Sequence, residues 1–131
     1  MKNLFRILWA PVVVFGLQML RRWLLPSEGW MDMIAHFLGG VSIAWMAQIM
    51  LALSQERQWS PKLPWFLHII LIVSFVVLIG VLWEFHEYLF GQFLYGPFIM
   101  TLADTLQDLA FDLAGALVCS VAIIYGQYRS R

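Results

Sequence analysis

Four long apolar segments make up most of this chain, and they leave few folds open to it. They run over residues 4–25, 31–53, 65–90 and 102–125. A helix needs about 20 mostly apolar residues to cross the hydrocarbon core of a bilayer, and each segment is long enough. In lipid, only helices and closed barrels satisfy their own backbone hydrogen bonds. The sequence therefore predicts an all-α membrane protein, a four-transmembrane-helix bundle formed as one membrane domain over residues 1–131.

The composition argues against an ordinary soluble domain. Apolar residues make up 62% of the chain and charged residues 12%, whereas soluble domains carry about 25% charged residues. The eight basic and eight acidic residues balance, and no basic run indicates a nucleic-acid partner. The partner that this composition predicts is the lipid bilayer.

The basic residues predict how the chain crosses the membrane. No small-residue cleavage site precedes Arg21 and Arg22, so we interpret the first segment as a retained helix rather than a signal peptide. Four spans place both termini and the 54–64 connection on one side. The basic residues of that side are Lys2, Arg6, Arg57, Lys62, Arg129 and Arg131. The other side has only Arg21 and Arg22, so the positive-inside rule predicts cytoplasmic termini.

Seven acidic or histidine residues are predicted to gather at one depth, in the outer half of the membrane. They are Asp32, His36, Glu84, Glu87, Asp104, Asp108 and Asp112. The second and fourth spans enter from the outer side and the third leaves toward it, so three stretches place these groups in the same half. Arg21 and Arg22 could balance only two of the carboxylates. The others must be protonated, hydrated in a cavity or bound to a cation.

The three aspartates of the fourth span recur every four residues. This spacing puts Asp104, Asp108 and Asp112 on one helix face, each turned about 40° from the last. Asp104 has a structural alternative as a first-turn acid behind an N-cap at Thr101. For Asp108 and Asp112 the alternative is a buried structural network, although intramembrane acids are functional-site candidates by default.

The other candidates come in two pairs. Asp32 and His36 are four residues apart and share a helix face, while Glu84 and Glu87 are three apart, separated by about 60°. The structural alternatives are a carboxylate at a helix start for Asp32 and an interfacial position for Glu87. The role of the nearby His86 stays open. Carboxylates and histidine together suit divalent transition metals, so a divalent metal ion is the cofactor that this set would hold.

These residues resemble the small bacterial integral membrane proteins of the VanZ-like group and the related YjdF-like group. In the VanZ-like pattern, an acid and a histidine four apart precede a span rich in small residues, as Asp32 and His36 do. A glutamate late in a span with a polar residue three on matches Glu84 and Glu87. The pattern ends with an aspartate, a polar residue and a glycine. Its matches here are Asp108, Asp112 and Gly115.

The paired aspartates Asp104 and Asp108 are similar to the YjdF-like version. The sequence departs from VanZ-like proteins at Met33, where a lysine often follows the aspartate. The resemblance implies a polytopic protein of the bacterial inner membrane. The VanZ name implies a link to resistance against a glycopeptide antibiotic that acts at the cell envelope. It implies no settled biochemical activity.

Three functions stay open from the sequence. The first is a metal- or proton-linked site that acts on a lipid or cell-envelope precursor, in which a metal would activate water or orient phosphate. The second is proton- or ion-coupled transport, although few polar groups continue the acids toward the cytoplasm. The third is a non-catalytic structural subunit whose acids form a protonated network. A homo-oligomer would add walls to such a site, and no sequence feature selects one.

Overall fold

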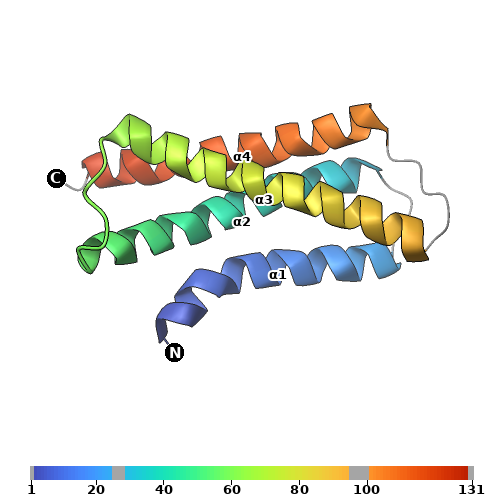
Figure 1. The fold of residues 1–131 in the computed structure, drawn as a ribbon, viewed down its shortest axis with the longest axis horizontal. Coiled ribbons are helices and arrows are strands. Elements are labelled where there is room, and N and C mark those ends of the chain that lie inside the picture. Colours follow the sequence, from blue (N-terminus) through green and yellow to red (C-terminus); the bar gives the residue numbers. More distant parts are fainter. Residues whose placement is uncertain (1, 25–28, 95–100, 130–131) are drawn as a thin grey trace.

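The computed structural model describes residues 2–24, 29–94 and 101–129, which form four helices (Figure 1). The helices are α1 (Lys2–Leu24), α2 (Gly29–Glu56), α3 (Trp65–Leu94) and α4 (Leu102–Arg129). The described ranges contain no strand. Each helix includes a stretch long and apolar enough to cross a membrane. These stretches are Asn3–Leu20, Gly29–Glu56, Trp65–Leu89 and Leu102–Gly126. The prediction of an all-α, four-helix membrane bundle is confirmed.

Three of the helices extend beyond the apolar segments that predicted them. Helix α2 begins at Gly29 and ends at Glu56, helix α3 continues to Leu94, and helix α4 continues to Arg129. Hydropathy marks the part of a helix that suits the hydrocarbon core, whereas backbone hydrogen bonding continues through the polar residues of the interface. The predicted spans therefore give the membrane-crossing part of each helix and not its ends.

Helix α2 ends in a left-handed cap. The backbone N–H of Trp59 donates to the carbonyl of Ser54 at 2.9 Å, and that of Gln58 donates to the carbonyl of Gln55 at 3.1 Å. Gln58 has a φ of 59°. This is the Schellman arrangement, in which the left-handed position is usually glycine. The cap turns the chain out of α2 toward α3.

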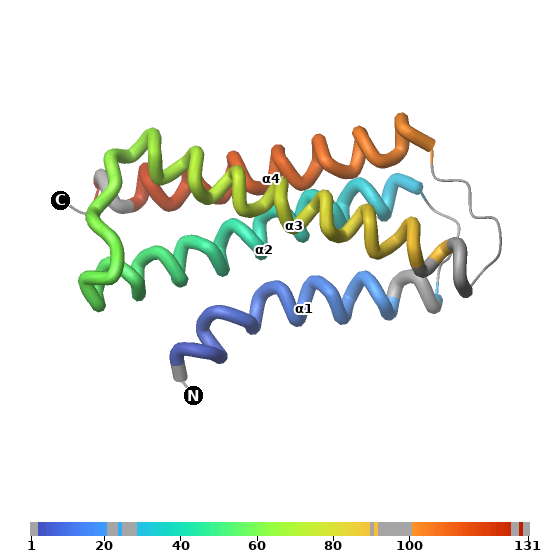
Figure 2. Tube along the Cα trace, viewed as in Figure 1, coloured from blue at the N-terminus to red at the C-terminus, as the bar shows by residue number. Residues whose placement is uncertain are grey.

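The four helices run antiparallel to their sequence neighbours (Figures 1 and 2). Both ends of the chain lie with the 57–64 connection at one end of the bundle, which we call the termini end. We call the opposite end, where α2 and α4 begin, the site end. Helix α2 is central: it packs most extensively against α4, and also against α1 and α3. Among the described residues, the backbone of α1 approaches α2 alone, so α1 is the least integrated helix of the bundle.

Two glycines set the close crossing of α2 and α4. A Cβ atom added to Gly40 would lie 2.1 Å from the carbonyl oxygen of Asp112, and one added to Gly115 would lie 2.2 Å from that of Phe37. Both distances are far below van der Waals contact, so the two backbones touch where side chains are absent. Small residues allow this approach between membrane helices. Because His36 and Asp112 lie within about one turn of these glycines, the crossing also brings their side chains together.

The apolar core lies between the crossing and the termini end. It consists of Ala44, Ala47, Leu51, Ile72, Val76, Ala116 and Cys119. Cys119 is buried there, as a small core residue. The one polar pair described between α2 and α3 in this half joins Gln48 to His68. The termini half is therefore mostly apolar, and the acids of the chain concentrate at the site end.

A buried histidine and acidic cluster

His36 lies between two aspartates of the neighbouring helix. Its side chain comes from α2, and the residue is only 4% exposed. Its Nδ1 atom is 3.4 Å from Oδ1 of Asp112, and its Nε2 atom is 3.7 Å from Oδ2 of Asp108. Both aspartates are on α4 and buried: Asp108 is 3% exposed and Asp112 is 7% exposed. The spacing of four residues places the two carboxylates one helical turn apart, so each faces a different nitrogen of the same imidazole ring.

Further carboxylates surround His36 from its own helix and from α3. Asp32, His36 and Asp108 each offer a ligand atom, and these atoms lie within 4.8 Å of one another. His36, Glu84 and Glu87 form a second group that meets the same distance. His36 is common to both groups. Carboxylates from three helices thus surround His36 in two overlapping groups.

The spacing of these atoms is close to what a metal ion requires. Zinc binds histidine nitrogen and carboxylate oxygen at about 2.0–2.2 Å, so two ligands of one ion lie at most about 4.4 Å apart. Within each group the ligand atoms lie up to 4.8 Å apart. Small side-chain rotations that move the carboxylate oxygens by about 0.4 Å would bring them to the distance that zinc allows. An imidazole with several carboxylates suits zinc, manganese or iron.

Glu84 is a buried carboxylate that needs a partner. It is 6% exposed, and neither of its carboxylate oxygens has a hydrogen-bond partner among the residues that the structure describes. The hydroxyl of Thr105 is a neighbour on α4, but the geometry falls short of a hydrogen bond. A buried carboxylate without a partner is costly, so this position favours a proton or a cation.

Two glycines make room for the Asp112 carboxylate. A Cβ atom at Gly80 of α3 would lie 2.6 Å from Oδ2, and one at Gly39 of α2 would lie 3.7 Å from Oδ1. Glycine is therefore needed at position 80 because a side chain there would collide with the carboxylate, and not because of the backbone conformation. The carboxylate is held between α2 and α3, with one oxygen turned to His36.

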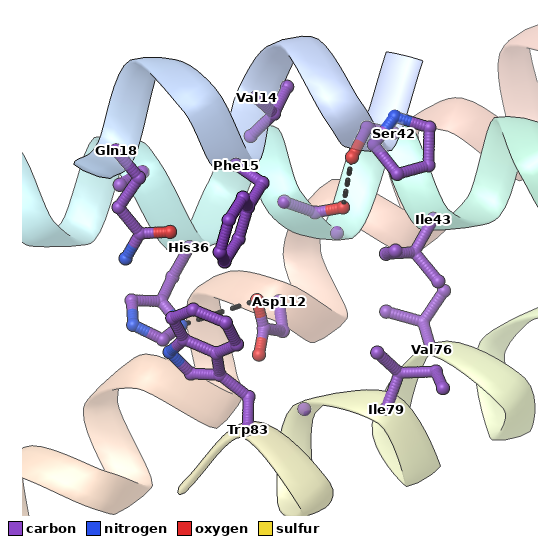
Figure 3. A pocket seen from close by; sticks show the side chains of 15 residues that line it. Val14, Phe15, Gln18, His36, Ser42, Ile43, Val76, Ile79, Trp83 and Asp112 are labelled. Carbon is purple, nitrogen blue, oxygen red and sulfur yellow. Dashed lines mark hydrogen bonds and ion pairs between the residues drawn. The ribbon is translucent and has the colours of Figure 1, made fainter. Parts of the chain in front are cut away.

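Hollows reach the cluster from two sides. One of about 100 Å³ is lined by His36 and Asp112 together with side chains of α1 and α3 (Figure 3). Another of about 350 Å³ lies between α3 and α4 and is lined by Glu84, Thr101 and Thr105 among apolar neighbours. The cluster is consequently not sealed inside packed side chains.

Asp104 does not join the cluster. It is exposed in the first turn of α4, and its backbone N–H donates to Oγ1 of Thr101 at 3.1 Å. Thr101 therefore acts as the N-cap, the structural alternative that the sequence offered for this acid. The seven candidate residues thus divide into six at or beside His36 and one at the helix start.

Aromatic rings beside the site pack against one another. The ring of His86 packs on that of Trp83, with centroids 5.1 Å apart and planes inclined at 34°. Trp83 also meets Phe15 of α1 edge to face at 5.7 Å. The side chains of Arg21 and Arg22, expected to balance two acids, lie outside the described residues.

Sequence reasoning missed two polar side chains beside the cluster. Gln18 of α1 and Trp83 of α3 line the same hollow as His36 and Asp112. The available signal was a lone glutamine in an otherwise apolar span, since a polar residue in a membrane helix usually faces the bundle interior. Trp83 carried no such signal, because tryptophan near the end of a span is typical of the interface.

Fold and cluster together define a polytopic membrane protein with a buried histidine–carboxylate cluster at one end of its bundle. A family model described as "Predicted membrane protein (DUF2238)" matches residues 5–130. The chain belongs to this family. No curated protein and no solved structure matches the chain.

Proposed function

We propose that the cluster binds a divalent transition-metal ion and acts on a lipid or cell-envelope substrate at the membrane. The observation that carries the proposal is the position of His36, a buried imidazole that belongs to two groups of ligand atoms, each group lying within 4.8 Å and the two drawing carboxylates from three helices. The ligands in this proposal come from two overlapping groups that share His36, one with Asp32 and Asp108 and the other with Glu84 and Glu87. A divalent ion would also offset the excess of acids.

Asp112 has a different role in this arrangement. Its carboxylate is on the Nδ1 side of His36, at 3.4 Å, and the Nε2 side faces Asp108. A ligating histidine usually donates its other N–H to a carboxylate, which fixes the tautomer and the orientation of the ring. Asp112 is therefore a positioning residue, which accepts from Nδ1–H so that Nε2 presents its lone pair to the metal.

The membrane setting supports a lipid or envelope substrate. The candidate ligands lie in helices that cross the bilayer, and the hollows beside them have mainly apolar walls. A bound metal would supply a Lewis acid for a phosphoryl or carbonyl oxygen, or an activated water. The residues of this chain would hold that ion and keep it in a low-dielectric environment.

The resemblance to VanZ-like and YjdF-like proteins supports a location in the bacterial inner membrane. The basic residues support cytoplasmic termini, since by sequence six flank the spans on the side of the termini and two on the other side. The cluster would then face the outer half of the membrane. Fusions of green fluorescent protein and alkaline phosphatase to the C-terminus test this orientation: fluorescence without phosphatase activity agrees with it, and the reverse contradicts it.

Metal analysis of the purified protein tests the proposed site. The protein is stripped with a chelator, reloaded separately with zinc, manganese or iron(II), and measured by elemental mass spectrometry. We expect about one ion per chain in the wild type and a loss in H36A and D108N. D104N, outside the cluster, serves as the matched control and should keep its metal. A wild type that binds none of these ions would end the proposal.

A second candidate function is structural. His36 is within ion-pair distance of both Asp108 and Asp112, so a charged or protonated network could hold α2 to α4 with no metal. In that case the variant D108N keeps the cellular phenotype of the wild type, because an asparagine preserves hydrogen bonding. Under the metal proposal the same variant loses it.

A further inference from the structure

Two hydrogen-bond donors beside the cluster are buried without an acceptor. Within the described part of the chain, neither Nε2 of Gln18 nor Nε1 of Trp83 has a hydrogen-bond partner. Both side chains line the hollow that reaches His36 and Asp112 (Figure 3). Ser42 lines it too, but its hydroxyl already donates to the carbonyl of Gly39 at 2.9 Å. Two N–H groups without an acceptor thus lie beside the hollow, and rotation of the Gln18 and Trp83 side chains would turn them toward an acceptor oxygen within it.

A second hollow lies beside this one. It has a volume of about 300 Å³, lies between α1 and α2, and shares Val14, Gln18 and Ala35 with the first. Its other lining residues include Leu17 and Ile34, which are 58% and 49% exposed. In a membrane these exposed apolar side chains face acyl chains. We call these two adjacent, mainly apolar hollows the α1–α2 groove, whose inner part is lined by Gln18 and Trp83.

We propose that this groove binds an acyl lipid, whose chain lies between α1 and α2 and whose ester or phosphate oxygen accepts hydrogen bonds from Gln18 and Trp83. Any reaction of the bound lipid rests on the proposed function, because His36, which both candidate ligand groups share, also lines the hollow. The binding itself depends only on the groove. The lipid oxygen would lie in the hollow that His36 and Asp112 also line.

The chemistry of the walls selects this occupant. A free phosphate would leave the apolar α1–α2 groove empty, while a plain hydrocarbon would leave both donors without an acceptor. An acyl lipid would fill the apolar groove with its chain and offer an acceptor oxygen to the two donors. The packing of α1 agrees with entry from the membrane, since among the described residues its backbone approaches α2 alone. Separation of α1 from α3 would require only the movement of side chains such as Phe15 and Trp83.

Photocrosslinking with lipids of defined structure tests the proposal. The purified protein, in a maltoside detergent that carries neither ester nor phosphate, is titrated with phosphatidylglycerol that carries a diazirine on one acyl chain. Diacylglycerol with the same chain retains the ester but lacks the phosphate, and an alkyl diazirine of equal length lacks both oxygens. Mass spectrometry of the peptides locates the label. We expect saturable labelling at the α1–α2 groove by one or both oxygen-bearing probes, and none that saturates with the hydrocarbon.

Conservative variants remove the donors one at a time. Q18L and W83F each delete an N–H group while keeping most of the side-chain volume, and each should weaken labelling about 3- to 10-fold, as the loss of one hydrogen bond does. W45F is the matched control, since Trp45 is 40% exposed and lines neither hollow. A thermal unfolding curve for each variant checks that it is folded.

Two results would overturn the inference. One is labelling of the groove that is equal for the hydrocarbon and the oxygen-bearing lipids. The other is labelling that Q18L and W83F leave unchanged. Metal content is measured on the same preparations, which separates the two proposals: saturable labelling of a protein that binds no metal supports the lipid site and rejects the metal site.

Discussion

Nδ1 of His36 lies 3.4 Å from Oδ1 of Asp112, across the crossing of α2 and α4. This contact depends on the backbone as much as on the two side chains. Gly40 and Gly115 let the helices touch within about one turn of it, and Gly80 leaves room for the second carboxylate oxygen. The position of the imidazole therefore depends on these glycines as well as on the Asp112 carboxylate.

The first prediction concerns Asp112. If its carboxylate orients His36, the D112N variant should bind zinc or manganese about 10- to 100-fold more weakly, which is the usual cost of losing an outer partner of a ligating histidine. Titration calorimetry in detergent measures the affinity. D108N should lose more, because it removes a direct ligand. Equal losses in the two variants would contradict the separate roles.

The second prediction moves Asp112 without changing its charge. In the G80A variant the new Cβ atom would lie 2.6 Å from Oδ2 of Asp112, so the carboxylate must shift. We expect the protein to fold and its metal affinity to fall about 10-fold or more, as in D112N. G16A is the control, since a Cβ atom at Gly16 meets nothing within 4 Å. Unchanged metal affinity in G80A would show that the carboxylate position is unimportant.

The third prediction concerns the helix crossing. In G115A the added Cβ atom would lie 2.2 Å from the backbone oxygen of Phe37, which cannot rotate away. We expect the free energy of unfolding to fall by about 1–3 kcal/mol, the usual cost of overpacking. In G126A, also on α4, nothing lies within 4 Å of the new Cβ atom, and helix propensity favours alanine by up to about 1 kcal/mol. Thermal unfolding in detergent compares the two variants, and a stable G115A would show that α2 and α4 separate freely.

The sequence was sufficient for the fold class because apolar length alone determines whether a segment can cross a bilayer. Part of the geometry of the cluster could also be predicted from spacing. Asp108 and Asp112 are one turn apart, and the structure places them on either side of the His36 ring. Periodicity along one helix predicts which side chains share a face, and antiparallel topology predicts which helix ends lie together.

Other features depended on contacts between helices, which spacing does not reveal. Asp104 continues the four-residue repeat, yet it is exposed at the helix start, because the N-cap at Thr101 begins α4 just before it. Gln18 lies at the cluster because of how α1 packs on α2. The sequence around Gly80 does not reveal that the Asp112 carboxylate lies against it.

The last prediction tests the cap of α2. Gln58 has a φ of 59°, a conformation in which a Cβ atom is unfavourable and glycine is not. Because Gln58 is exposed, the Q58G variant loses no buried contact. It should stabilise the protein by about 0.5–1 kcal/mol, once the greater entropy of glycine in the unfolded chain is subtracted. Q58A keeps a Cβ atom and should give no gain, which makes it the control. The midpoint of thermal unfolding measures both. A higher midpoint for Q58A than for Q58G would show that the end of α2 is helical in solution rather than capped through the left-handed residue.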